Sequence, residues 1–173
     1  MRVVALLAIR NEENYIERCL EHLYEQAVET CLIDNGSTDR TLEIAKSFLK
    51  KGVFRIEYLP YSGIYEWKKI LKFKGSLAHE INSDWFIHHD GDEIREAPSP
   101  YANLIEAIKD ADEKDCNAIN SDEFVFIPTS DDEEFEGKDY VREMKYYYFF
   151  DTVKSFMQIL SVVLFSMVFI VPN

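Results

Sequence analysis

The feature that most constrains the fold is a continuous apolar run near the start of the chain, Val3–Ile9 (VVALLAI). A strand with one solvent-exposed face alternates apolar and polar residues, whereas a parallel strand covered by helices on both faces is apolar throughout. The run is too short for the core of a secretory signal, and no small-residue cleavage site follows it. We therefore predict that it is the first strand of a parallel sheet.

Helical and strand-like segments alternate after this run. Asn14 and Glu17 have the spacing of a capping box at the start of a helix, and Ser37 or Thr38 is suited to cap a second helix. Pro100 is typical of the first turn of a further helix, the one that includes 104–108. The other predicted elements are strands at 30–33, 54–59 and 85–88, and helices that include 42–49, 66–81 and 104–108. This alternation predicts an α/β sandwich with a mostly parallel sheet.

The pattern changes after residue 117. Residues 117–128 and 139–150 are each predicted to be a strand, and the acidic loop 129–137 between them is interpreted as a solvated tip. Residues 155–173 contain no charged side chain. Three interpretations of this tail stay open: a membrane anchor, a buried or interfacial segment, and the aberrant end of a truncated or frame-shifted reading. We accordingly divide the chain into a domain at 1–150 and an apolar tail at 155–173.

Composition limits the classes of partner. The chain has 173 residues, of which 47% are apolar, and this is the size of one domain. Its net charge of −13 argues against binding to nucleic acid but allows an anionic small molecule whose charge is offset by a metal ion or by local lysines. The odd number of cysteines, Cys19, Cys31 and Cys116, without C-x-x-C spacing, indicates buried thiols in a reducing compartment, and we expect a cytoplasmic protein.

Polar clusters follow three of the predicted strands. They are RNEE at 10–13, DNGSTD at 34–39 and HHDGDE at 88–93. Ligands of open parallel sheets bind beyond the carboxyl ends of the strands, where these clusters are expected to lie together. If the strand continues through Asp90 and Asp92, both carboxylates project to one side and can hold a hard divalent ion such as Mg²⁺ or Mn²⁺. Gly91 would let a diphosphate approach the backbone, although an acidic surface turn explains the same residues.

The three segments LLAIRNEENYIERCLEHLYEQ, CLIDNGSTDRTLEIAKSF and DWFIHHDGDEI, in this order, resemble the family 2 glycosyltransferases over about residues 3–125. The resemblance implies a GT-A fold, a Rossmann-like three-layer sandwich. It also implies that Asp34 binds the nucleoside of a donor and that Asp92 binds the metal, with Asp90 nearer the ribose and diphosphate. The residues expected to line the nucleotide pocket are Ala8, Arg10 and Glu12.

Other site residues are less defined by the resemblance. The resemblance implies that a lysine of the helix before the D-x-D strand faces the pyrophosphate, and we expect this to be Lys69, with Lys68 and Lys72 as alternatives. A solvated helix face is the other interpretation of these lysines. Inverting members of the family need a carboxylate base, which usually comes from the second half of the GT-A domain. Asp122 and Glu123 are the candidates in the right general part of the fold, although they lie earlier than the usual base and the C-terminal half is expected to be incomplete. We expect one of His88 and His89 to pack inward, while the other could touch the nucleotide.

Three functions compete at this point. The first is a metal-dependent, inverting transfer of a sugar from a nucleotide-diphosphate donor to a hydroxyl of an unknown glycan, lipid or protein acceptor, with Mn²⁺ or Mg²⁺ as cofactor. The second is a shortened GT-A half that binds the nucleotide sugar without turnover. The third is a nucleotidyltransferase, which the absence of glycine from AIRNEEN disfavours. A tail that reaches a membrane is compatible with the first.

Overall fold

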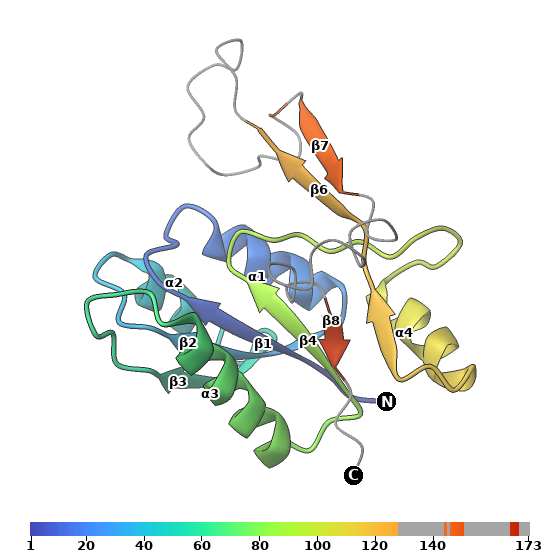
Figure 1. Cartoon of the computed structure of the whole chain (residues 1–173), viewed down its shortest axis with the longest axis horizontal. Coiled ribbons are helices and arrows are strands. Elements are labelled where there is room, and N and C mark those ends of the chain that lie inside the picture. Colours follow the sequence, from blue (N-terminus) through green and yellow to red (C-terminus); the bar gives the residue numbers. More distant parts are fainter. Residues whose placement is uncertain (128–143, 145, 151–166, 170–173) are drawn as a thin grey trace.

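The computed structural model describes residues 1–127, 144, 146–150 and 167–169, and its central element is a parallel sheet between two helical layers (Figure 1). The four parallel strands are β1 (Val3–Ile9), β2 (Glu29–Asp34), β3 (Val53–Tyr58) and β4 (Trp85–Asp90). The helices are α1 (Ile16–Glu25), α2 (Thr41–Ser47), α3 (Trp67–Glu80) and α4 (Leu104–Glu113). The predicted α/β sandwich with a mostly parallel sheet is confirmed.

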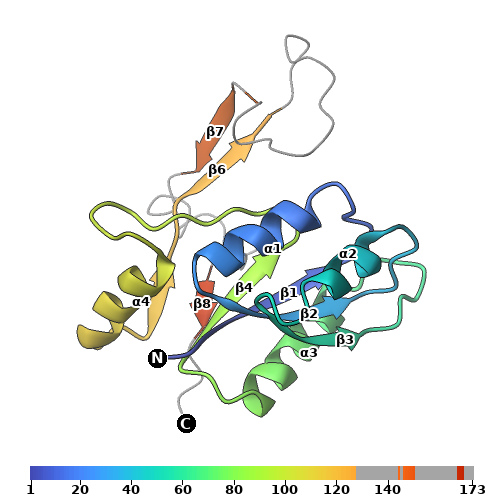
Figure 2. The ribbon, with the colours of Figure 1, turned by 180° about the vertical axis from the view of Figure 1, so that it is seen from behind.

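Two apolar cores cover the two faces of the sheet, and each follows from the periodicity of its helices. One core combines the apolar stripes of α1 and α2 and part of α4 with alternate residues of β1 and β4, among them Leu7 and Ile87. The other combines Ile70 and Leu77 of α3 with Leu6 and Phe86 from the opposite face of the same strands. Figure 2 shows α1 and α2 in front of the sheet, with α3 behind it. The continuous apolar run of β1 is therefore explained by burial on both faces.

The order of the strands creates a switch point between β1 and β4. The sheet runs β3-β2-β1-β4-β8-β5, so that the chain moves outward from β1 to β3 in one direction and then crosses to β4 on the other side. In sheets of this kind the crevice at the carboxyl ends of the two central strands is the usual ligand site. The topology thus directs attention to the residues that follow β1 and β4.

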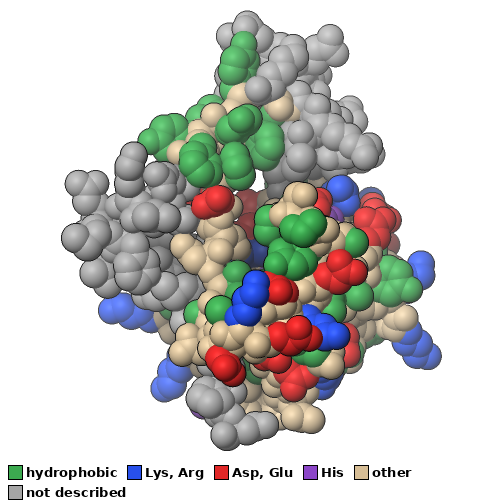
Figure 3. Space-filling view, turned by 90° about the vertical axis from the view of Figure 1, so that its right-hand side faces the viewer, with side chains coloured by type: hydrophobic (Ala, Val, Ile, Leu, Met, Phe, Trp, Pro, Cys, Tyr) green, Lys and Arg blue, Asp and Glu red, His purple; other side chains and the backbone are tan. Residues whose placement is uncertain are grey.

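Short strands extend the sheet and form a second one. β8 (Met167–Phe169) pairs antiparallel with both β4 and β5 (Ala118–Asn120). β6 (Glu123–Phe126) and β7 (Tyr147–Phe150) form a separate antiparallel pair. Phe124, Tyr147 and Tyr148 of this pair are more than half exposed, and apolar side chains gather there in Figure 3.

The predicted helix starts are wrong in detail because other residues satisfy the free backbone N–H groups. α1 begins after Tyr15, without a side-chain cap, and the backbone N–H groups of Tyr15 and Ile16 donate to Glu12 O (2.9 Å each), so Asn14 is not the cap. α2 begins after Arg40 rather than at Ser37 or Thr38.

The helix start predicted at Pro100 is also wrong. α4 begins after Asn103, which lies three residues beyond Pro100. The side chain of Asn103 accepts a hydrogen bond from the backbone N–H of Glu106. An asparagine cap therefore sets this start.

Other predictions concern the C-terminal part of the chain. The single strand predicted at 117–128 is two strands, β5 and β6, with Ser121 and Asp122 between them. The acidic loop 129–137 and most of the tail 155–173 lie outside the described residues. Within the part of the chain that is described, no helix is long and apolar enough to cross a bilayer.

Cys19 and Cys31 are buried as predicted, whereas Cys116 is exposed, which corrects the prediction for that thiol.

Candidate functional site

The carboxyl ends of β1, β2 and β4 bring the three polar clusters to one edge of the sheet. In the strand register, Ile9 lies beside Asp34 and Ala8 lies beside Asp90. Because neighbouring strands are about 4.8 Å apart, the backbones of Asp34 and Asp90 lie roughly 10 Å apart on either side of β1. The two aspartates therefore frame the end of the first strand.

The first and second clusters are joined by hydrogen bonds. The backbone N–H of Glu12 donates to Thr41 Oγ1 (2.7 Å), and the backbone N–H of Thr38 donates to Asn11 Oδ1 (2.8 Å). Asp39 accepts from the backbone N–H groups of Thr41 (3.0 Å) and Glu13 (3.3 Å). These bonds fix the two loops to each other and give the site a defined wall.

Asp34 is held by its own turn. Its side chain is buried, and Oδ1 accepts a hydrogen bond from the backbone N–H of Ser37 (3.0 Å). Gly36, in the same turn, has a φ of +72°, and a Cβ there would lie 3.0 Å from Tyr61 Cβ. The turn thus needs glycine for both its backbone conformation and its close approach to Tyr61. The carboxylate of Asp34 is consequently fixed in direction before any ligand binds.

Arg10 stacks on an aromatic ring and keeps one hydrogen-bond donor available for a ligand. Its guanidinium carbon is 3.7 Å from the centre of the Tyr61 ring, within the range of a cation–π contact. Among the described residues, its buried Nε has no hydrogen-bond partner. A buried donor without a partner is costly, so this N–H is suited to an acceptor on a ligand.

The D-x-D cluster is a turn rather than an extension of the strand. β4 ends at Asp90, and the backbone N–H of Glu93 donates to Asp90 O (3.3 Å). The alternation argument for placing Asp90 and Asp92 on one side therefore does not apply, because it required an extended chain. Asp90 is partly buried and Asp92 is exposed. Gly91 packs against the first cluster, since a Cβ there would lie 3.1 Å from Glu12 Cγ.

Carboxylates crowd this corner of the sheet. Burial first, and then the charges of Asp92, Asp90 and Asp39, raises the pKa of Glu12 to about 7. Burial also raises the pKa of Asp90, and Asp92 adds to this effect while Lys74 opposes it. Crowded carboxylate oxygens are a donor set that suits Mg²⁺ or Mn²⁺. The described residues do not themselves form a group of three or more ligating side chains, so such an ion would also need ligands from elsewhere.

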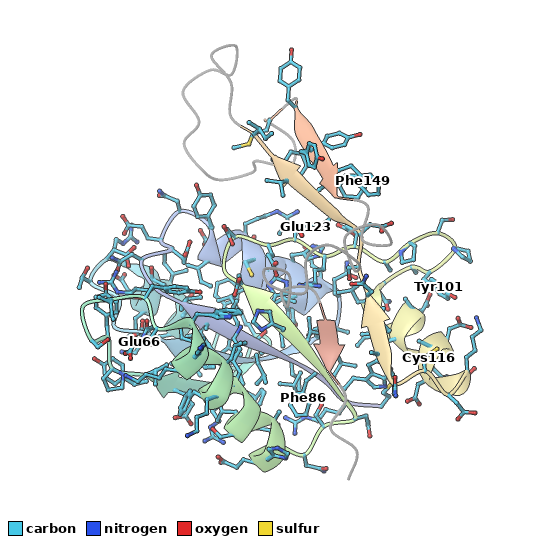
Figure 4. The ribbon with its side chains drawn as sticks, in the orientation of Figure 1. Glu66, Phe86, Tyr101, Cys116, Glu123 and Phe149 are labelled. Atoms are coloured by element: carbon cyan, nitrogen blue, oxygen red, sulfur yellow. The ribbon has the colours of Figure 1, made fainter. Side chains whose placement is uncertain are left out.

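The lysine in contact with the D-x-D cluster is one that the sequence did not single out. Lys74 of α3 is buried, and its Nζ lies 3.7 Å from Asp90 Oδ1. By contrast, Lys69 is exposed and pairs with Glu66 (3.1 Å), at the start of α3 (Figure 4). Lys68 and Lys72 are exposed as well. The missed signal was that position 74 lies on the helix face that carries Ile70 and Leu77, so that a lysine there is buried.

Both histidines of the third cluster are buried, on opposite faces of the sheet. His88 faces α3, where it accepts a hydrogen bond from Lys74 Nζ (3.2 Å), and its ring lies edge-on to Trp67. His89 faces α1, where Nδ1 lies 3.9 Å from Cys19 Sγ. Burial, with the charges of Arg95 and Lys74, lowers the pKa of each histidine to about 3, so both rings are neutral near pH 7.

The two carboxylates considered as a base belong to another part of the fold. Asp122 is exposed between β5 and β6, and Glu123 is the first residue of β6 (Figure 4). Arg95 Nη1 lies 3.5 Å from Ser121 Oγ, which connects the segment after the D-x-D turn with this region. A role for either carboxylate stays a prediction.

Comparisons with known proteins agree with the fold and the motifs. Residues 5–62 match the sequence model described as glycosyl transferase family 2. A lipopolysaccharide core biosynthesis glycosyltransferase, LpsC of Rhizobium meliloti (strain 1021), is 30% identical over 90 residues, which cover 51% of this chain and 31% of LpsC. This chain thus spans about a third of the length of that relative. The predicted resemblance to family 2 is confirmed.

Solved structures show the same fold. S. aureus TarS 1–349 in complex with UDP is similar with a TM-score of 0.55 at 21% identity, over 78% of this chain and 40% of that chain. The mannosyltransferase PcManGT from Pyrobaculum calidifontis, in complex with GDP-Man and Mn²⁺, is similar with a TM-score of 0.52 at 19% identity, over 69% of this chain and 34% of that chain. These likenesses confirm the GT-A fold.

Proposed function

We propose that this chain, with its family 2 segment and GT-A fold, is the donor-binding part of a glycosyltransferase that transfers a sugar from a nucleotide-diphosphate sugar to an acceptor hydroxyl. One observation carries the proposal: polar residues from the ends of three adjacent parallel strands meet beside the switch point of the sheet, and two of those strands lie in the matched segment. The names of two similar structures, which were solved with UDP and with GDP-Man, support a nucleotide as the ligand.

The nucleoside would bind between the first two clusters. The buried Asp34 carboxylate has a fixed direction, which suits hydrogen bonding to a base. Arg10 brings a guanidinium that stacks on Tyr61 and a buried Nε that can donate to a carbonyl of the base or to a phosphate. Ala8 and Glu12 are proposed to line the same pocket, and Asp90 to lie near the ribose and diphosphate.

A divalent ion would bind at the D-x-D turn. Asp92 is the proposed direct ligand because it is exposed, and Asp90 is the proposed neighbour on the strand end. When bound, Mn²⁺ or Mg²⁺ offsets the charge of the diphosphate and stabilises it as a leaving group. The crowded carboxylates support this assignment, since a cation relieves their mutual repulsion.

Transfer with inversion requires a base that removes the proton of the acceptor hydroxyl as the hydroxyl attacks the sugar. Asp122 and Glu123 remain the proposed candidates within the described residues, and the acceptor, whether glycan, lipid or protein, is open. We further propose that residues 1–150 form the GT-A domain and that the apolar tail 155–173 adds one strand to it, since β8 pairs with β4 and β5.

We also propose a second, narrower function for this chain. The chain spans 31% of LpsC and 40% of TarS 1–349, so much of each relative has no counterpart in it. Under this proposal the chain binds the donor without transferring the sugar. Release of free nucleotide from UDP- or GDP-sugars, measured with and without candidate acceptors, separates the two functions.

Calorimetric titration with UDP and GDP, each with and without Mn²⁺, tests donor binding. We expect binding that depends on Mn²⁺ and is lost in Asp92→Ala. Glu113→Ala is a matched control, because Glu113 is an exposed acid on α4 whose ion pair with Lys109 is solvated. Equal affinity in Asp92→Ala and the wild type would contradict the metal site. No binding of either nucleotide by the folded protein would contradict the proposed function as a whole.

A further inference from the structure

A buried cation lies directly behind the D-x-D turn. Lys74 is 4% exposed, and its Nζ donates to the backbone carbonyl of His89 (3.0 Å) and to Nδ1 of His88 (3.2 Å). The carboxylate of Asp90 is the oppositely charged group beside it, at 3.7 Å. A buried ammonium is costly unless it is paired and hydrogen-bonded, so this arrangement depends on Asp90.

The groups around Lys74 leave Asp90 as the main source of negative charge. β4 contributes two histidine rings that are neutral, and a neutral ring at position 88 must accept the lysine hydrogen bond through Nδ1. Glu93, after the turn, also favours the charged lysine, but it pairs with Arg95 (3.0 Å). The other lysines named for α3 are exposed and lie on other faces of the helix.

The two aspartates of the turn therefore differ in their surroundings. Asp90 is partly buried against Lys74, whereas Asp92 is exposed. A divalent ion that approaches the turn meets one carboxylate that faces water and another whose charge an internal ammonium already compensates. An ion bound at the turn and the ammonium of Lys74 would both interact with this carboxylate, and their charges repel.

We propose that Lys74 is a positioning residue that holds the Asp90 carboxylate toward the protein and competes with the divalent ion for it, so that Asp92 becomes the main metal ligand. This inference rests on the proposed donor site and adds to it a residue and a division of roles between the two aspartates. Lys74 also holds the carbonyl of His89, one residue before Asp90, and so fixes the strand end on which the turn is built.

The test measures Mn²⁺ affinity in the absence of nucleotide, by the electron paramagnetic resonance signal of free Mn²⁺. Lys74→Met should bind Mn²⁺ at least about five-fold more tightly than the wild type. Two unit charges about 4 Å apart interact by about 1 kcal/mol even at the dielectric constant of water, and this energy corresponds to roughly that factor in affinity. The gain should disappear when both variants also carry Asp90→Asn. Lys109→Met, an exposed change on α4 and away from the proposed site, should leave the affinity unchanged.

A purely structural lysine would give a different pattern. Equal or weaker Mn²⁺ binding by folded Lys74→Met, or a gain that persists with Asp90→Asn, would overturn the inference. If Lys74→Met is unfolded without metal, circular dichroism during Mn²⁺ addition replaces the affinity measurement: recovery of the folded signal supports competition for one site, and no recovery overturns it. Absence of Mn²⁺ binding in both the wild type and Lys74→Met would instead remove the metal from the proposed function, and the inference with it.

Discussion

Replacing Gly91 by alanine tests the contact between the D-x-D turn and the first polar cluster. A Cβ at this position would lie 3.1 Å from Glu12 Cγ and 3.2 Å from Ile9 Cγ2. Both distances are shorter than the optimal carbon–carbon separation of about 3.5–4.0 Å. Ile9 belongs to the core and cannot move freely, so the turn or Glu12 must shift by a few tenths of an ångström.

The expected cost follows from overpacking. Adding a methyl group to a packed site destabilises a protein by about 1–3 kcal/mol. For a domain of this length each kcal/mol corresponds to about 2–4 °C, so Gly91→Ala should lower the melting temperature by roughly 2–12 °C. It should also weaken UDP or GDP binding, because the displaced Glu12 lies in the proposed nucleotide pocket.

Gly75→Ala is a matched control with the opposite expected sign. Gly75 lies in α3, and a Cβ there would have no side chain or neighbouring element within 4 Å. Alanine in an exposed helix position is favoured over glycine by about 0.5–1 kcal/mol, so this variant should melt at a slightly higher temperature. Thermal melts followed by circular dichroism compare the two variants. If Gly91→Ala is as stable as Gly75→Ala, the close packing described at the turn is refuted.

Three further outcomes are expected. Asp39→Ala removes the acceptor for the backbone N–H groups of Thr41 and Glu13. It should lower the free energy of unfolding, measured in urea, by about 0.5–2 kcal/mol. An unchanged urea midpoint would mean that water replaces these hydrogen bonds. Tyr61→Ala should weaken nucleotide binding because it removes the ring on which Arg10 stacks, and calorimetry that finds unchanged affinity would exclude that role. Chelation with EDTA should abolish nucleotide binding, and added Mn²⁺ should restore it; binding that persists in EDTA would argue against a metal.

The sheet and its edge could be predicted because their signals are local in the sequence. A strand buried on both faces is apolar at every position, as Val3–Ile9 is, and the polar cluster that follows marks its carboxyl end. Helix starts were harder, because their N–H groups are satisfied by partners that sequence spacing does not identify. The Glu12 carbonyl that receives the first N–H groups of α1 belongs to a turn whose shape depends on the second cluster.

Lys74 shows a second limit. The resemblance implied a lysine on this helix and left Lys69 as the choice with Lys68 and Lys72 as alternatives, and because lysines on a helix are usually solvated, a buried lysine was not considered. Burial of Lys74 depends on a contact between α3 and the end of β4, which are brought together only by the fold. The position of Lys74 between Ile70 and Leu77 on one helix face was visible in the sequence, but its partner Asp90 was not.

The measurement that tests the central claim most directly is a crystal structure of the chain with UDP or GDP and Mn²⁺, with anomalous diffraction used to locate the manganese. The account predicts the nucleoside beside Asp34 and Arg10, and an anomalous peak between the Asp92 carboxylate and the diphosphate at the ends of β1 and β4. A nucleotide bound elsewhere on the protein, or manganese without contact to Asp92 or Asp90, would contradict it.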